Sequence, residues 1–253
     1  MDDSHNFDPE TLTGRSGRHT RLLPGLDMPV HAAVVAPFMA LREAAAAEGF
    51  DLRPVSGFRD FGRQLAIWNA KCRGRRALLD RYGLPLDVAE LDDRGRVEAI
   101  LLWSALPGAS RHHWGSERDV IDAAALAPGQ RPQLVPAEFS PGGPFHRLEG
   151  WLARHLADFG FYRPYATDRG GVMPEPWHIS HAAVAAAAEA AFTREVLEAA
   201  LADAGIDAHD AVRERLPWIF ERYVRNVDAA PALALANATV GTAAGVTPPT
   251  RLS

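Results

Sequence analysis

The chain has 253 residues, 47% of them hydrophobic, and a formal net charge of −5, which is typical of one globular domain with extensions. The acidic balance argues against a nucleic-acid partner, which usually requires a basic face. No apolar run approaches the roughly 18 residues of a membrane-spanning helix, and the polar amino terminus does not match a secretory signal. We therefore expect a cytoplasmic protein with no membrane partner. The single cysteine, Cys72, excludes an internal disulfide and is expected to be a buried or half-buried thiol.

The first third of the chain predicts an arm, two helices and a strand. Residues 1–26 are expected to form an irregular arm. An apolar stripe through residues 34–45 predicts a helix, with Pro37 at a kink or in the first turn. Residues 51–59 predict a short strand that runs into a loop, and residues 59–83 predict a second helix.

The middle of the chain alternates between helical and extended patterns. A helical piece is expected around residues 97–106, and residues 119–122 predict a buried strand. Residues 125–143 are rich in Pro and Gly and predict a long loop. Residues 148–159 form a strongly amphipathic pattern typical of a helix, and residues 161–162 could start another strand.

The carboxy-terminal part is helical in pattern and then bland. Residues 182–191 are alanine-rich and helical, and Thr193 is a plausible N-cap for the next helix. A last helix is expected over residues 212–223, bent near Pro217, and residues 228–253 predict a disordered or loosely docked tail. Separated helices and short strands favour an α+β fold over regular βαβ alternation.

Three segments hold polar residues whose chemistry fits together. They are residues 56–59 followed by Gln64, residues 110–119, and residues 174–178. Hydrolytic zinc sites usually have three protein ligands from His, Asp or Glu, with water in the fourth position. His112, Asp119 and His178 could form such a set, with Glu175 as a base that is not itself a ligand. Residue types alone leave open that the two adjacent histidines are merely solvated or satisfied in the core.

These segments resemble the VanY-type zinc D-alanyl-D-alanine carboxypeptidases, which are related in fold to the zinc domain of Hedgehog proteins. The resemblance covers roughly residues 30–183. The family pattern Ser-x-His-x-x-Gly-x-x-x-Asp is matched by Ser110, His112, Gly115 and Asp119. The pattern Glu-x-Trp-His is matched by Glu175, Trp177 and His178, and the upstream Ser-Gly-aromatic-Arg with a downstream Gln is matched by Ser56, Gly57, Phe58, Arg59 and Gln64.

The resemblance implies a fold with a small antiparallel sheet flanked by helices, and one zinc ion. It divides the chain into an arm (1–26), a zinc peptidase domain (27–183), a helical extension (184–227) and a flexible tail (228–253). It also implies that His112, Asp119 and His178 bind the zinc ion and that Glu175 is the general base. Arg59 would stabilise the oxyanion or clamp the substrate carboxylate, and Ser110 and Gln64 would hydrogen-bond the substrate. Trp177 could form the pocket wall or simply belong to the core.

The same register assigns supporting roles to the remaining polar residues. His113 falls on a free position of the motif, and His181 does not directly follow Trp as the motif requires. Glu117 is expected to be structural or to lie just outside the metal ligands. Asp122 is expected to be an ordinary polar residue at the end of its strand.

The predicted partner is a peptidoglycan-derived peptide or muropeptide that loses its terminal D-alanine. The absence of a recognisable signal favours the L,D bond of recycled tetrapeptides over D-Ala-D-Ala. A stem-peptide endopeptidase and a non-catalytic zinc-binding module are the alternatives, and Glu175 argues against the latter because a structural zinc needs no base. The sequence leaves the oligomeric state open.

Overall fold

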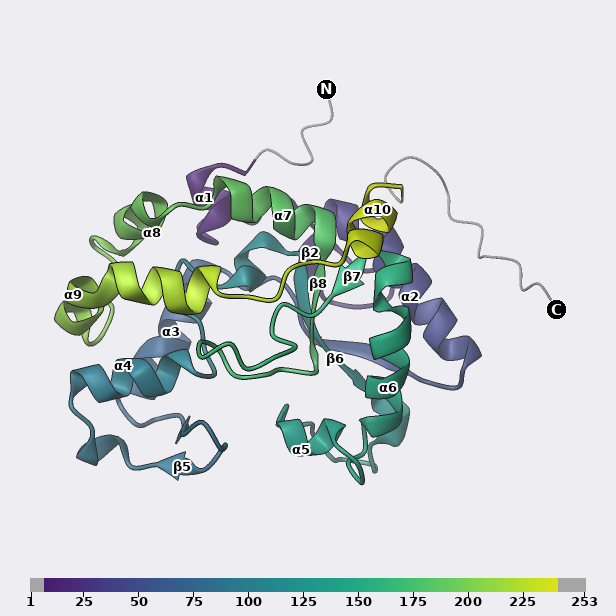
Figure 1. Ribbon diagram of the computed structural model, residues 1–253, viewed down its shortest axis with the longest axis horizontal. Coiled ribbons are helices and arrows are strands. Elements are labelled where there is room, and N and C mark those ends of the chain that lie inside the picture. The colour runs from purple at the N-terminus through teal and green to yellow at the C-terminus, as the bar shows by residue number, and fades with distance from the viewer. Residues whose placement is uncertain (1–6, 241–253) are drawn as a thin grey trace.

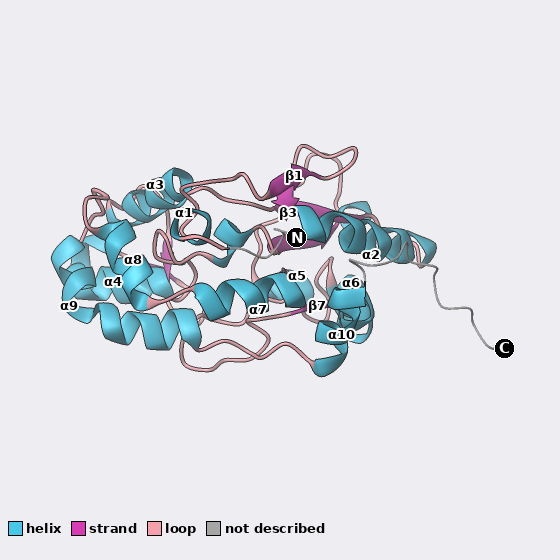
Figure 2. Ribbon diagram, turned by 90° about the horizontal axis from the view of Figure 1, so that it is seen from above, coloured by secondary structure: helices cyan, strands magenta, loops and turns pink. Residues whose placement is uncertain are grey.

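The computed structural model describes residues 7–240, and its centre is a four-stranded antiparallel sheet (Figures 1 and 2). The strands lie in the order β3 (Leu52–Ser56), β6 (Glu117–Asp122), β8 (His178–His181) and β7 (Phe161–Tyr162). Short strands between separate helices confirm the predicted α+β class.

Strand β6 organises the sheet because it pairs with β3 on one side and with β8 on the other. All six of its residues are buried. The register places Asp119 opposite both Ser56 and His178. Residues from three distant parts of the sequence therefore meet at one point of the sheet.

Two groups of helices pack around this sheet. Helix α2 (Val35–Ala47) packs against β3, and α6 (His146–His155) continues as a 3-10 helix over Leu156–Phe159 that contacts α2. Pro37 lies in the first turn of α2, where its missing N–H costs no helical hydrogen bond. Gly160, with φ of 76° in the left-handed region, ends the 3-10 helix that follows α6.

The other group consists of α3 (Phe61–Cys72), α4 (Asp93–Leu101) and α9 (His209–Ile219). Helix α4 contacts both α3 and α9. Helix α9 continues as a π-helix over Phe220–Arg225, close to the bend predicted at Pro217. Shorter elements complete the chain: 3-10 helices at Ala32–Val34, Val88–Glu90 and Ala123–Ala125, and helices α5 (Pro136–Phe139), α7 (Ala182–Ala191) and α8 (Arg194–Leu201).

Helix α3 is shorter than the sequence pattern predicted. It ends at Cys72, and Gly74 follows with φ of 69° in the left-handed region. The rest of the predicted helix instead contains β4 (Leu78–Leu79) and the turn that leads to its partner strand β5 (Pro85–Leu86). The turn of this hairpin lines a cavity.

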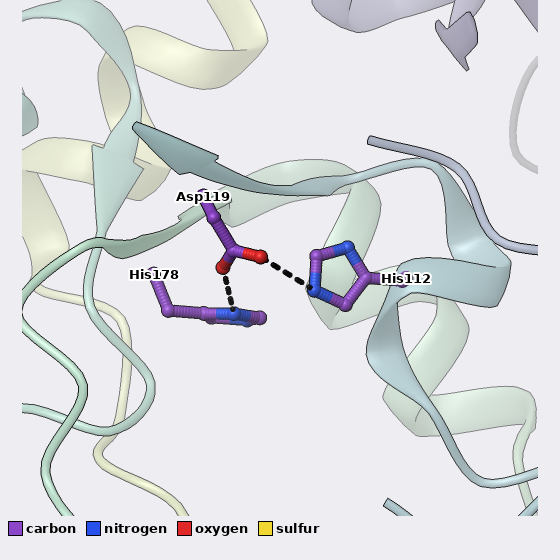
Figure 3. Close-up of side chains that lie close together, drawn as sticks. All are labelled: His112, Asp119 and His178. Carbon is purple, nitrogen blue, oxygen red and sulfur yellow. Dashed lines mark hydrogen bonds and ion pairs between the residues drawn. The ribbon is translucent and has the colours of Figure 1, made fainter. Parts of the chain in front are cut away.

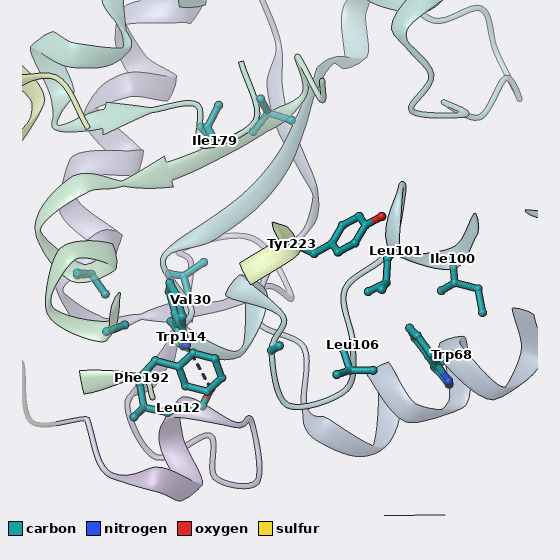
Figure 4. Packing of buried hydrophobic residues seen from close by; sticks show 14 of the residues in the cluster. Leu12, Val30, Trp68, Ile100, Leu101, Leu106, Trp114, Ile179, Phe192 and Tyr223 are labelled. Atoms are coloured by element: carbon teal, nitrogen blue, oxygen red, sulfur yellow. Dashed lines mark hydrogen bonds between the residues drawn. The ribbon is translucent and has the colours of Figure 1, made fainter. Parts of the chain in front are cut away.

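The amino-terminal arm is more ordered than predicted. It contains α1 (Pro9–Leu12), capped by the Asp8 side chain, and β1 (Thr20–Leu22), which pairs with β2 (Pro29–His31). Leu12 is buried in the main core, where its carbonyl accepts a hydrogen bond from Trp114 Nε1 (Figure 4). The arm is thus part of the fold over its described residues.

Of the tail predicted to be disordered or loosely docked, residues 232–240 are not disordered but form the helix α10. Ala234 and Ala238 are buried, one helical turn apart, against α7 and the 3-10 helix that precedes Gly160. A Cβ on Gly160 would lie 2.7 Å from the Ala238 Cα, so the helix docks because both residues are small. Residues 241–253 of the predicted tail lie outside the described residues. Among the residues described, none of the helices is long and apolar enough to cross a lipid bilayer.

Candidate active site

Three side chains from separate elements converge beside β6. His112 lies in a 3-10 helix over Arg111–Trp114, Asp119 lies in β6, and His178 begins β8. The loop between the first two turns at Gly115, whose φ is 68°. A Cβ at Gly115 would lie 2.6 Å from the His31 backbone nitrogen, so both the φ angle and the space require glycine.

The close-up shows the two imidazoles on either side of the Asp119 carboxylate (Figure 3). His178 Nδ1 is 3.1 Å from Asp119 Oδ1, and His112 Nε2 is 3.7 Å from Asp119 Oδ2. One potential ligand atom from each residue lies within 4.8 Å of the others, and all three residues are buried. Two imidazole nitrogens and a carboxylate oxygen are a donor set that suits zinc.

Hydrogen bonds orient both imidazoles for metal binding. His112 Nδ1 lies 2.9 Å from the Gly57 carbonyl oxygen, so this nitrogen must donate, and Nε2 keeps its lone pair toward Asp119. Burial lowers the pKa of His112 to about 3, which keeps the ring neutral. His178 directs Nδ1 toward Asp119, and its Nε2 donates to Glu117 Oε2 at 3.0 Å.

Glu117 belongs to a buried ionic network behind His178. Its Oε1 atom accepts hydrogen bonds from Arg111 Nε at 3.0 Å and from the hydroxyls of Ser116 and Ser180. Burial opposes ionisation, but Arg111 and His178 lower the pKa of Glu117 to about 2. In the absence of a metal ion, hydrogen bonds to Asp119 and Glu117 overcome burial and raise the pKa of His178 to about 10. The expectation that Glu117 supports the site without ligating the metal agrees with this arrangement.

Glu175 lies beside the His178 imidazole, and both residues line the cavity. Its Oε2 atom is 3.6 Å from His178 Nδ1, and its backbone N–H donates to the Tyr165 carbonyl. Burial raises the pKa of Glu175 to about 7, with the charge of His178 opposing the rise. A carboxylate with a pKa near neutrality can both accept and return a proton.

Arg59 and Gln64 form a pair in which only the arginine lines the cavity. Arg59 Nη1 donates to Gln64 Oε1 at 2.7 Å, and Gln64 Nε2 donates to the Ala105 carbonyl at 2.7 Å. Gln64 is fully buried. This geometry does not support the predicted contact of Gln64 with substrate and instead places the amide behind the guanidinium.

A cavity of about 710 Å³ opens over these groups. Ser110 and Trp177 line it, and Trp177 also packs on Phe139 with ring centroids 5.7 Å apart, so it is both pocket wall and core. Sequence reasoning missed Tyr165, which lines the cavity with its ring centroid 5.0 Å from that of His178. Its motif-free position between a proline and a turn carries no signal that could have identified it.

The residues that the motif register set aside have other partners. His113 is fully buried, with Nδ1 2.5 Å from the Arg59 carbonyl and Nε2 accepting from the Gly108 N–H. Asp122 accepts hydrogen bonds from the Asp51 and Ala124 backbones. The Cys72 thiol is buried, and its pKa is raised to about 12, as expected for an unreactive cysteine.

Fold and site together give an α+β protein with a candidate metal centre beside its central sheet. The family model described as VanY, D-alanyl-D-alanine carboxypeptidase, matches residues 27–184, which is more than half of the chain. The chain therefore belongs to the VanY family of D-alanyl-D-alanine carboxypeptidases.

The chain is also similar to individual proteins and solved structures. An uncharacterized protein of Haemophilus influenzae is 46% identical over 101 residues, which cover 39% of this chain and 69% of that protein. A second uncharacterized protein of that organism is 38% identical over 121 residues, 47% of this chain and 92% of that protein. Among solved structures, VanYB in complex with D-Alanine-D-Alanine is 21% identical, with 77% of this chain and 87% of that chain covered and a TM-score of 0.47. The LdcB LD-carboxypeptidase is 22% identical, with coverage of 73% and 80% and a TM-score of 0.42.

Proposed function

We propose that this protein is a zinc-dependent carboxypeptidase that removes the C-terminal D-alanine from peptidoglycan-derived peptides. The observation that carries the proposal is the position of Glu175, 3.6 Å from the His178 ring nitrogen that also faces Asp119. A carboxylate with a raised pKa beside a His–Asp–His donor set is what peptide hydrolysis requires. Membership of the VanY family supports the choice of substrate.

The roles of the protein groups follow from their positions. His112, Asp119 and His178 would hold zinc, which when bound supplies Lewis-acid polarisation of the scissile carbonyl and acidifies water. Glu175 takes a proton from the attacking water and returns it to the leaving amine, as a group with a pKa of about 7 can do near neutrality.

Arg59 supplies the positive charge that the substrate needs inside the cavity. Burial lowers the pKa of its guanidinium, while the charges of Asp119 and Glu175 oppose that shift. Because Gln64 holds one edge of the guanidinium, the rest can bind the terminal carboxylate or the developing oxyanion. Ser110 lines the same cavity and can contribute a hydrogen bond to the substrate.

For the bond that is cut, we propose the L,D bond of a tetrapeptide, as the sequence predicted, with the D-Ala-D-Ala bond of a pentapeptide as the competing assignment. The zinc-loaded protein is incubated with each muropeptide, and the products are identified by mass spectrometry with and without a chelator. We expect loss of one alanine from the tetrapeptide, stopped by the chelator and restored by zinc.

The same experiment separates the alternatives. Preferential loss of alanine from the pentapeptide would transfer the assignment to the D,D bond. Fragments cut inside the stem peptide would identify an endopeptidase. Release of alanine from neither peptide by zinc-loaded protein would refute the proposed function.

A further inference from the structure

The turn between β4 and β5 holds an exposed aromatic residue beside the catalytic cavity. Tyr82 lines the cavity, yet 79% of its surface is exposed, and Leu84 on the same turn is 61% exposed. In Figure 1, β5 lies below α4, and α5 lies below β6. Large apolar side chains exposed together at the mouth of a pocket are typical of a binding surface.

Hydrogen bonds from within the turn and from a neighbouring tryptophan support its conformation. Asp80 Oδ1 accepts from the backbone N–H groups of Tyr82 and Leu84, each at 2.8 Å. The Asp80 carbonyl accepts from Trp103 Nε1 at 2.9 Å, and Gly83 takes a φ of 78°. Tyr82 is therefore presented toward solvent by an ordered turn, which reduces the entropy lost on binding.

An ion pair accompanies this aromatic residue at the cavity mouth. Arg81 Nη2 is 2.8 Å from Asp168 Oδ2, with side-chain exposures of 57% and 36%. Asp168 is anchored by the Gly170 N–H, which donates to Oδ1 at 2.9 Å. Arg81 itself lines the cavity. An accessible guanidinium and an accessible carboxylate thus lie next to each other.

The facing wall is a loop that is also held in place. Leu134 lines the cavity with a φ of 55°, an uncommon angle for a leucine. The Glu138 carboxylate maintains it by accepting hydrogen bonds from the Gln133 and Leu134 backbones at 2.8 to 3.1 Å. We call Arg81, Tyr82, Leu134 and Asp168 the mouth subsite.

We propose that the mouth subsite binds the diamino-acid residue of the stem peptide, in the form whose side chain ends in both an ammonium and a carboxylate group. The proposal rests on the proposed function. A cavity of about 710 Å³ has room for more than a terminal alanine. The alkyl part of such a side chain can pack against Tyr82 and Leu134. Its carboxylate is opposite in charge to Arg81, and its ammonium group is opposite in charge to Asp168. A lysine side chain offers no carboxylate to Arg81.

The test compares two tetrapeptides that differ only in the third residue, meso-2,6-diaminopimelate or L-lysine. For the unmodified protein we expect kcat/KM to be about tenfold higher with diaminopimelate, since one charge-assisted contact is gained. Arg81→Gln should remove most of this preference by raising KM for the diaminopimelate peptide, with kcat nearly unchanged. Tyr82→Ala should raise KM for both peptides. Equal kcat/KM for the two peptides in the unmodified protein would overturn the proposal.

Arg94→Gln is the matched control, because Arg94 is also 57% exposed in an ion pair, with Glu214, and does not line the cavity. It should leave both KM values unchanged. Titration calorimetry of both peptides with the zinc-loaded Glu175→Gln variant measures affinity without turnover. A preference there, together with no turnover by the unmodified protein, would support the subsite and refute the proposed reaction. Turnover without any preference in binding would refute the subsite alone.

Discussion

Glu117 accepts a hydrogen bond from His178 Nε2 at 3.0 Å, on the ring edge opposite the one that faces Asp119. The carboxylates of Asp119 and Glu117 therefore lie on opposite edges of one imidazole. A carboxylate in the position of Glu117, which is not a metal ligand itself, sets the tautomer of a metal-binding histidine and increases its basicity. Arg111 balances the buried charge of Glu117 at 3.0 Å, so the support is itself electrostatically compensated.

The Glu117→Gln variant should bind zinc about tenfold to a hundredfold more weakly. The amide keeps the shape of the side chain but removes the charge that increases the basicity of His178. Competition with a chromophoric chelator measures this affinity directly.

Asp122→Asn is the control for that measurement, since Asp122 ends the same strand and its side chain accepts hydrogen bonds from the backbone N–H groups of Asp51 and Ala124. It should bind zinc like the unmodified protein. An unchanged zinc affinity in Glu117→Gln would show that this carboxylate does not support the metal.

The adjacent histidines should differ in their effect on the metal. His112→Gln should lose zinc because Nε2 is one of three clustered ligand atoms. His113→Gln should retain zinc but lose about 1–3 kcal/mol of unfolding free energy, because its buried hydrogen bonds to Arg59 and Gly108 are disturbed. Metal content after dialysis, with thermal denaturation in parallel, checks both. Zinc loss in His113→Gln with an intact fold would contradict the register.

Glu175→Gln should keep zinc and lose activity. The amide cannot accept the proton of the attacking water, and removing a general base typically costs about 10²–10⁴ in rate. Metal content and kcat are measured on the same preparation. Activity close to that of the unmodified protein would remove Glu175 from the mechanism.

Gln64→Ala should leave the Arg59 guanidinium less well positioned. The guanidinium loses its hydrogen-bond partner at 2.7 Å, so we expect KM to rise by about tenfold and kcat to fall by less. Gln64→Glu keeps the acceptor for Arg59 but loses the donor to the Ala105 carbonyl, so it should restore the KM only in part. If both variants have the same KM as the unmodified protein, Gln64 does not position Arg59.

Acid should destabilise the protein partly through His113. Burial lowers its pKa to about 4 in the fold, against 6.5 in a model peptide. The unfolded chain therefore binds the proton more readily, and this contribution to stability is complete above pH 6.5 and lost as the pH falls to about 4. The expected loss is about 3 kcal/mol. Unfolding free energies of the unmodified protein and His113→Gln at pH 7 and 4.5, in the same metal state, should show a smaller loss in the variant.

Spacing alone left a zinc site open, and the resemblance carried by the motifs indicated the three residues, His112, Asp119 and His178, that the structure brings together. His112 and Asp119 lie seven positions apart around a required glycine, and Glu175 precedes His178 by three, so local chain geometry brings each pair close. The strand at residues 119–122 was predicted from its two β-branched residues, Val120 and Ile121, but its charged residues gave no sign that all six residues of β6 are buried.

Contacts between distant segments were decided only by tertiary packing. Glu117 and His178 are 61 positions apart and meet through the register of β6 and β8, while Arg81 and Asp168 are 87 positions apart. The tail helix forms because Gly160 and Ala238 allow a close approach that alanine-rich composition alone does not reveal. Local patterns encode which backbone shapes and donor groups are available, but burial and strand register determine which of them become partners.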